Sequence, residues 1–186
     1  MQYMVVSDIY GITPSLQLFA KHFKAGNNLV DPYEAIRQEF ENEQQYYQYF
    51  INHGGHEQYL AKLVKYFNEL TKPTTCIAFS AGASAAWRAQ ALTTNPLLKK
   101  LIAFYPTQIR HHTAINARVP CEFIFAAHET HFSVDAVIAN LNKKAQVHCI
   151  KTPYQHGFMN QHAENFNQQG YRYFIKTRCD VHFGSA

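Results

Sequence analysis

Three side chains in this sequence have the types and the order that nucleophilic catalysis needs. Ser80 stands in the run CIAFSAGASAAW (76–87), where the hydroxyl follows an apolar stretch and precedes a series of small residues. A serine hydroxyl is a weak nucleophile at neutral pH, so it needs a base to take its proton and a third group to orient that base. Glu129 and His156 follow later, each in a short polar loop behind a strand-like run. The order serine, acid, histidine is typical of a nucleophile on a sharp turn from strand to helix.

Two alternatives compete with this interpretation. Ser80 can instead cap the helix that follows it, because serine is a preferred N-cap residue. Asp135 is a second candidate for the acid, but it falls inside a predicted helix, where its side chain points away from the strand ends. We therefore predict Ser80 as the nucleophile, Glu129 as the acid and His156 as the base.

An attacking serine also needs two backbone N–H groups for the negative charge that develops on the carbonyl oxygen. Ala81, directly after the serine, is predicted to supply one of them. The other is expected from the loop SDIYGIT (7–13), where Gly11 permits a tight turn. Within this loop the N–H of Ile9 is the first choice and that of Tyr10 is the alternative.

These groups need a scaffold in which the carboxyl ends of several strands meet. Short apolar and β-branched runs predict strands at residues 2–7, 27–31, 74–80, 100–105, 121–127 and 146–151. Helical spacing predicts helices after Thr13 and Pro14, over 60–70, after Ser80, over 133–144 and from near His162. Strands that alternate with helices predict an α/β fold, a three-layer α/β/α sandwich around a mostly parallel sheet of about six strands.

The composition is typical of one globular domain. The chain has 186 residues, 47% of them hydrophobic, which is enough for one core and short for two. The net charge of +4 is scattered, with no block of like charges, so neither nucleic acid nor a membrane surface is an expected partner. One segment, residues 33–56, is polar and rich in aromatic residues. It is a candidate cap over a cleft or a cover for a sheet edge, or its aromatic residues simply pack on the surface of the domain.

Compartment and metal content are also open to prediction. The N-terminus lacks the basic region and cleavage site of a signal peptide, and no apolar stretch reaches the roughly 18 residues of a membrane helix, so a cytoplasmic location is expected. The four cysteines form no CxxC pair, which argues against a disulfide framework and a zinc site. The pairs His53/His56 and His128/His131 lack a third ligand at recognisable spacing. We expect no metal and no cofactor.

Four segments together resemble the α/β-hydrolase fold and, within it, the dienelactone hydrolase family. In chain order they are VVSDIYGITP, CIAFSAGASAAW, CEFIFAAHETHFSVDAV and YQHGFMN. The resemblance covers nearly the whole chain and implies a single α/β-hydrolase domain over 1–186. It implies the same site residues, namely Ser80, Glu129 and His156, with Ile9 and Ala81 as oxyanion donors. It also puts Asp8, beside Tyr10, where dienelactone hydrolases carry a glutamate that interacts with their nucleophile.

The sequence departs from the family pattern in four places. Ala78 replaces the first glycine of the elbow, and the acid is glutamate where aspartate is usual. The nucleophile is serine, whereas dienelactone hydrolases use cysteine, which argues against dienelactone as the substrate. The chain begins at what would be the third strand of the fold, so the first two strands are expected to be missing and the strand at 27–31 to lie at an edge.

The sequence thus predicts a serine hydrolase that cleaves an ester, thioester or lactone of a small carboxylic acid through an acyl-enzyme on Ser80. The alternative is a non-catalytic protein of the same fold that binds a small ligand or a protein partner. An acyltransferase would differ only in the acceptor that it admits. A small ester-type substrate is the expected partner, with an aromatic or apolar acyl group, and the chain is expected to be a monomer or a homodimer.

Overall fold

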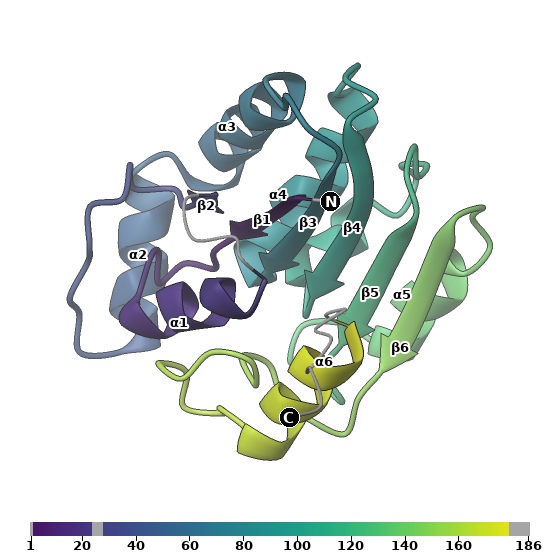
Figure 1. Ribbon diagram of the computed structural model, residues 1–186. Coiled ribbons are helices and arrows are strands. Elements are labelled where there is room, and N and C mark those ends of the chain that lie inside the picture. Colours follow the sequence, from purple (N-terminus) through teal and green to yellow (C-terminus); the bar gives the residue numbers. More distant parts are fainter. Residues whose placement is uncertain (1, 24–27, 179–186) are drawn as a thin grey trace, which may run out of the picture.

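The computed structural model describes residues 2–23 and 28–178. Within them, six strands form one parallel sheet in the order β2-β1-β3-β4-β5-β6 (Figure 1). The strands are β1 (Gln2–Val6), β2 (Leu29–Val30), β3 (Thr74–Phe79), β4 (Leu98–Phe104), β5 (Cys121–Phe125) and β6 (Val147–Lys151). The predicted α/β fold with a parallel sheet of about six strands is confirmed.

Helices cover both faces of the sheet, which is the middle layer of a three-layer sandwich (Figure 1). On one face lie α3 (Gly55–Asn68), α4 (Ser80–Leu92) and α5 (Val134–Leu141). On the other face lie α1 (Pro14–His22) and α6 (Gln168–Arg178). The segment before α3 adds α2 (Glu43–Asn52), and a short 3₁₀ helix, η1 (Thr107–His111), follows β4. No helix in the described part of the chain is both long enough and apolar enough to span a bilayer.

Each face of the sheet has its own hydrophobic core, because successive residues of a strand point to opposite faces. In β3, Cys76 and Ala78 pack in the core beneath α3, α4 and α5. Ile77 and Phe79 pack in the other core, beneath α1 and α6. All four side chains are buried. Ser80 therefore follows directly on a strand that is covered on both faces.

The first helix begins where its residues predict. The Oγ1 of Thr13 accepts a hydrogen bond from the backbone N–H of Leu16 at 3.1 Å, so Thr13 is the N-cap. Pro14 occupies the first turn, where its missing N–H costs no hydrogen bond. This cap fixes the end of the loop that leads from β1 into α1, which is the loop expected to carry an oxyanion donor.

The last helix begins later than predicted. It was expected from near His162, but α6 starts at Gln168. The preceding residues form turns, because the Oδ1 of Asn160 accepts the N–H of His162 at 2.8 Å. A second asparagine, Asn167, accepts the N–H of Gly170 at 2.9 Å and satisfies a donor in the first turn of α6. These local hydrogen bonds compete with helix formation.

The edge strand β2 is also shorter than the predicted run. It spans Leu29–Val30 and pairs with Val5 and Val6 of β1, while residue 27 lies outside the described residues. The residues of 33–42 that follow are without helix or strand. The edge position predicted for this strand is confirmed by the strand order.

Candidate active site

The turn from β3 into α4 is sterically constrained at two positions. Ser80 has a φ of 47°, in the left-handed region that residues other than glycine rarely adopt. At Gly82, a Cβ atom would collide with the carbonyl oxygen of Ser7 at the end of β1. The small residues of 76–87 thus have a steric cause: the helix lies against the end of the neighbouring strand. The result is a serine on a strained turn at the carboxyl edge of the sheet, half-buried and with its side chain projecting beyond β3.

The three residues predicted as nucleophile, base and acid lie in one chain of hydrogen bonds. The Oγ of Ser80 is 3.0 Å from Nε2 of His156. The Nδ1 of His156 is 2.8 Å from Oε1 of Glu129. Because a carboxylate oxygen accepts, Nδ1 is the donor in that pair, which leaves Nε2 of a neutral imidazole free to accept the serine proton. The side chains of His156 and Glu129 are 25% and 11% exposed, so the pair is largely shielded from water.

The loops behind β5 and β6 hold the acid and the histidine in place. An isolated antiparallel bridge joins Glu129 to Phe132 and closes a tight turn around the acid. After His156, Gly157 has a φ of 84°, and a Cβ there would lie 2.7 Å from the Cβ of Ala163. Phe158 is fully buried and anchors the loop in the core beneath α1 and α6. The HGF step in the sequence therefore combines the histidine with a turn glycine and an aromatic anchor.

Asp135, the competing candidate for the acid, lies elsewhere. It is in the first turn of α5, and both of its carboxylate oxygens are 2.8 Å from Nζ of Lys151. Of the two carboxylates considered for the acid, Glu129 contacts the histidine and Asp135 contacts Lys151.

The two backbone donors predicted for an oxyanion are placed as follows. Ala81 is in the first turn of α4, where N–H groups have no partner within the helix, and no side chain caps this helix. The N–H of Tyr10 donates to Oδ1 of Asp8 at 3.0 Å and is therefore occupied. The N–H of Ile9 has no hydrogen-bond partner among the described residues. Of the two choices in this loop, only Ile9 keeps its donor available.

A side chain that the sequence did not single out supports this loop from the segment 33–56. The hydroxyl of Tyr33 donates to the carbonyl oxygen of Ile9 at 2.7 Å, and Tyr33 is buried. Its ring also lies where a Cβ on Gly11 would collide, at 2.9 Å. Tyr33 is 24 residues from Ile9 along the chain, and nothing in the local sequence pattern indicates this contact.

Asp8 lies beside the candidate triad and binds two groups. Its Oδ1 accepts the N–H of Tyr10, and its Oδ2 accepts Nδ2 of Asn160 at 2.6 Å. Burial raises the pKa of Asp8 to about 6, although both hydrogen bonds and the nearby imidazole of His156 lower it in part. The resemblance put Asp8 where a glutamate interacts with the nucleophile. Here its hydrogen bonds instead join the loop after β1 to the loop that carries the histidine.

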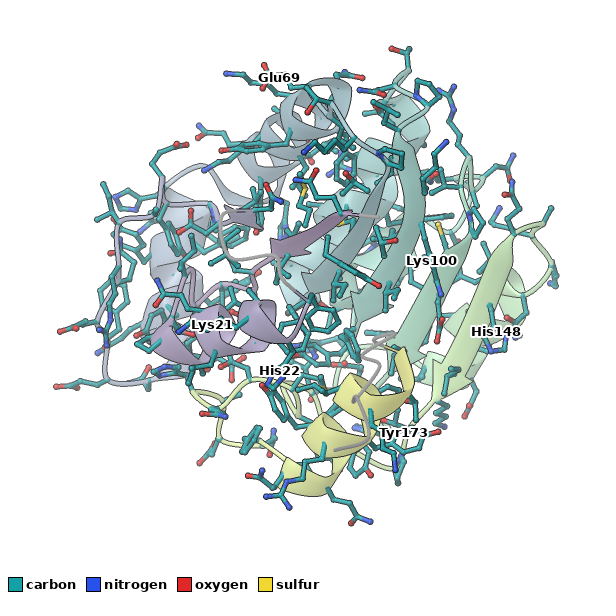
Figure 2. The ribbon with its side chains drawn as sticks, in the orientation of Figure 1. Lys21, His22, Glu69, Lys100, His148 and Tyr173 are labelled. Carbon is teal, nitrogen blue, oxygen red and sulfur yellow. The ribbon has the colours of Figure 1, made fainter. Side chains whose placement is uncertain are left out.

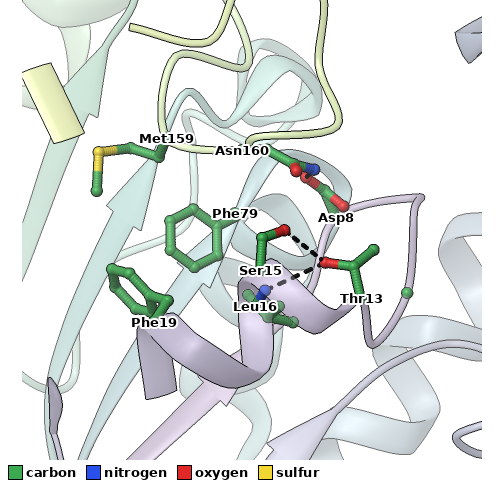
Figure 3. A pocket seen from close by; sticks show the side chains of 9 residues that line it. Asp8, Thr13, Ser15, Leu16, Phe19, Phe79, Met159 and Asn160 are labelled. Atoms are coloured by element: carbon green, nitrogen blue, oxygen red, sulfur yellow. Dashed lines mark hydrogen bonds between the residues drawn. The ribbon is translucent and has the colours of Figure 1, made fainter. Parts of the chain in front are cut away.

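A small cavity borders this carboxylate. Figure 3 shows the side chains of Asp8 and Asn160 meeting above Ser15 and Thr13, with Phe79 closing one side. The cavity has a volume of about 20 Å³, which is room for one water molecule and too little for a substrate. Among the described residues, no group of three or more histidine, cysteine, aspartate or glutamate side chains is arranged to hold a metal ion.

Comparison with known proteins gives likeness in structure without likeness in sequence. No protein-family model matches the sequence, and no curated protein matches it. A dienelactone hydrolase-like promiscuous phosphotriesterase from metagenomic libraries aligns with a TM-score of 0.63 at 11% identity, over 97% of this chain and 84% of that one. A predicted CIB-like hydrolase from Thermoplasma acidophilum aligns with a TM-score of 0.64 at 12% identity, over 97% and 87%.

A third solved structure, esterase PE8, aligns with a TM-score of 0.55 at 14% identity, over 95% of this chain and 90% of that one. All three likenesses extend over nearly the whole of this chain. Together with the parallel sheet and the turn at Ser80, they show that the chain has the α/β-hydrolase fold.

Proposed function

We propose that this protein is a serine hydrolase, similar to the dienelactone hydrolase family, that cleaves an ester, thioester or lactone of a small carboxylic acid. The observation that carries the proposal is the continuous chain of hydrogen bonds from Ser80 through His156 to Glu129, with the serine on a strained strand-to-helix turn. The structural neighbours include hydrolases and an esterase, which supports hydrolysis as the reaction class.

The proposed reaction has two steps. In the first, Oγ of Ser80 attacks the carbonyl carbon while Nε2 of His156 takes its proton, and the oxyanion is held by the N–H groups of Ile9 and Ala81. The intermediate collapses, His156 protonates the leaving alcohol or thiol, and an acyl-enzyme remains. In the second, water attacks the acyl group while His156 takes its proton. Collapse releases the acid and returns the proton to Ser80. Glu129 orients the imidazole throughout.

The proposal extends to the setting of the enzyme. We place it in the cytoplasm, because three cysteines are present as free thiols and all are at least half-buried. Burial raises the pKa of Cys121 and of Cys149 to about 12, so neither thiol is activated as a nucleophile. The substrate is a small molecule, and the chain acts as a monomer or a homodimer.

The direct test is labelling with a fluorophosphonate, which reacts covalently with activated serines. Mass spectrometry of the labelled protein is expected to place the adduct on the peptide that contains Ser80. Label is expected to vanish in Ser80→Ala and in His156→Ala, with circular dichroism verifying that both variants are folded. Absence of label on the folded wild-type protein would contradict the hydrolase and favour the binding protein of the same fold.

A further inference from the structure

A second, larger hollow lies beside the candidate active site. It has a volume of about 450 Å³, within the range of small-molecule binding sites. One wall comes from the segment before and at the start of α2, with Phe40, Glu43 and Tyr46. Glu164, from the turns after the histidine loop, also lines the hollow. Tyr10, from the loop after β1, lines it as well. We call this hollow the cap pocket.

The cap pocket adjoins the reacting groups. Tyr10 directly follows Ile9, the proposed oxyanion donor, and its ring faces the ring of Tyr46 at a centroid distance of 4.6 Å. The charge of Glu43 contributes to raising the pKa of Asp8, and also of Tyr105. The ring of Tyr105 is 4.8 Å from that of His156. The cap pocket thus shares Tyr10 with the loop that supplies the proposed oxyanion donor.

The side chain of Tyr10 contributes a hydroxyl to this pocket that is free to bind a ligand. Tyr10 is only 7% exposed, and its hydroxyl has no hydrogen-bond partner among the described residues. Burial and the neighbouring carboxylates raise the pKa of this phenol, so it stays uncharged. Phe40 extends the aromatic wall, with its ring 5.0 Å from that of Tyr46. Aromatic faces at such a site attract a cation through their quadrupoles.

The charges that line the cap pocket also favour a cation. Three carboxylates line it, from Glu41, Glu43 and Glu164, while no lysine or arginine is among the described lining residues. The histidine that lines it is His162, whose ring is stacked 6.4 Å from that of Tyr10. The chain as a whole carries a net charge of +4, so this pocket is an acidic hollow in a basic protein. Such a hollow concentrates cations and repels carboxylates.

We propose that the cap pocket binds a positively charged ammonium group of the substrate, so that the enzyme prefers esters carrying a cation over their uncharged isosteres. The preference in turnover rests on the proposed hydrolase function, whereas the binding preference does not. The aromatic walls hold the methyl or methylene groups around the nitrogen, and the carboxylates supply the charge.

Turnover tests this with substrate pairs that differ only in charge. Acetylcholine is compared with the ester in which carbon replaces the quaternary nitrogen, which puts the charge in the alcohol part. Phenyl trimethylammonio-butyrate is compared with its carbon isostere, which puts the charge in the acyl part. In at least one pair, kcat/KM is expected to be about 10-fold higher for the cation, as a desolvated cation–π contact with carboxylates nearby implies. Equal kcat/KM within both pairs would overturn the proposal and leave the hydrolase standing.

Variants of the pocket test its charge. Glu43→Gln combined with Glu164→Gln is expected to reduce the preference for the cation, measured as the ratio of kcat/KM for the cation to that for its uncharged isostere, by about 5-fold or more. The matched control is Glu69→Gln. Glu69 is exposed at the end of α3, just before β3 begins, so it lies at the opposite edge of the sheet from Ser80 (Figure 2). A preference that survives in the double variant, or that falls equally in the control, would contradict the assigned pocket.

Binding gives a readout that is independent of catalysis. In Ser80→Ala, or in His156→Ala if the first variant is unstable, calorimetry with acetylcholine and its carbon isostere is expected to show tighter binding of the cation. If binding favours the cation but neither ester is cleaved by the wild-type protein, the hydrolase proposal fails and the pocket assignment holds. Equal affinity for the two compounds, or no binding of either, overturns the pocket assignment.

Discussion

The elbow around Ser80 and the segment 33–56 both contact the loop after β1 but are built on different principles. In the elbow almost every side chain is small and buried, and the backbone itself is constrained by contact with β1. In the segment, exposed carboxylates alternate with aromatic rings that contact one another, as between Tyr33 and Tyr49 at 5.4 Å. The position of the candidate nucleophile is thus set by local backbone constraints, whereas the pocket that would select a substrate is built from contacts between distant parts of the chain.

Removing the elbow hydroxyl is the largest perturbation. Ser80→Ala is expected to lower kcat on a short acyl ester by about 10⁴-fold or more, because residues that act as a catalytic unit lose nearly all of their effect together. Hydrolysis of p-nitrophenyl acetate by the purified variant measures this. The control is Ser133→Ala, which removes a serine that caps α5. A Ser80→Ala variant that keeps most of the activity would show that Ser80 is not the nucleophile.

Substitution of the proposed acid, Glu129, is expected to have the next largest effect on activity. Glu129→Gln preserves the shape of the side chain but loses the charge that orients the imidazole, so kcat is expected to fall by about 10²- to 10⁴-fold. The matched change Asp135→Asn breaks the pair with Lys151 on the surface and is expected to leave kcat within about 2-fold. Both variants are assayed on the same ester. A larger loss in Asp135→Asn than in Glu129→Gln would reassign the acid.

Substitution of one glycine in each region tests how tightly the backbone is constrained there. Gly82→Ala forces a Cβ against the carbonyl oxygen of Ser7, so the free energy of unfolding is expected to fall by about 3 kcal/mol or more. Gly55→Ala, at the start of α3 with a φ of 57°, meets only the Cδ1 of Ile51 at 3.7 Å, so about 1 kcal/mol of left-handed strain is expected. Urea unfolding measures both. Equal losses would mean that the elbow is no tighter than the segment.

Asp8 is expected to make the free energy of unfolding depend on pH, in a direction that follows from its raised pKa. Its folded pKa of about 6 lies above the ordinary value of 3.8, so between these pH values the folded protein holds more protons than the unfolded chain. This contribution to stability is therefore lost as pH rises from about 4 to about 6, by about 3 kcal/mol in total, and is constant above that.

The variant Asp8→Asn removes this titration. Its free energy of unfolding, measured in urea from about pH 4 to pH 7, is expected to lack the decline that Asp8 contributes to the wild-type curve. Because Asn resembles the protonated form of Asp8, the two curves should lie closest near pH 4 and separate as the pH rises, the wild-type protein losing stability relative to the variant. Parallel curves would show that Asp8 titrates normally in the folded protein, and that the bond to Asn160 outweighs burial.

Features that depend on local sequence were predicted, whereas most features that depend on contacts between distant segments were not. All six strands were predicted to within two residues at every described end, because apolar runs and their flanking turns are local signals. The triad candidates were predicted because each follows a strand at the carboxyl edge, where parallel strands bring loops together. The late start of α6 was missed, since side-chain hydrogen bonds from Asn160 and Asn167 replace the helical ones there.

The contacts that could not be predicted join residues that lie far apart along the chain. Asn160 and Asp8 are 152 residues apart, and no spacing rule connects an asparagine in one loop with a carboxylate in another. The cap pocket likewise needs residues from the loop after β1, from the segment before α2 and from the turns before α6. The aromatic residues of 33–56 were recognised as a candidate cap, but whether they form a wall depends on which rings they contact.

The contact that joins the two regions gives the smallest effect. Tyr33→Phe removes the hydroxyl that donates to the carbonyl oxygen of Ile9 and leaves that buried oxygen without this donor, which is expected to cost about 1 kcal/mol of stability. Ile9 also supplies the proposed oxyanion N–H. If the loss of this hydrogen bond lets the backbone of Ile9 move, kcat should fall several-fold while KM stays nearly unchanged. Tyr47→Phe, on a side chain that is 45% exposed in α2, is the matched control and should change neither quantity. If Tyr33→Phe lowers stability but not kcat, the segment supports the fold of this loop without positioning the donor, and the two regions are independent in function.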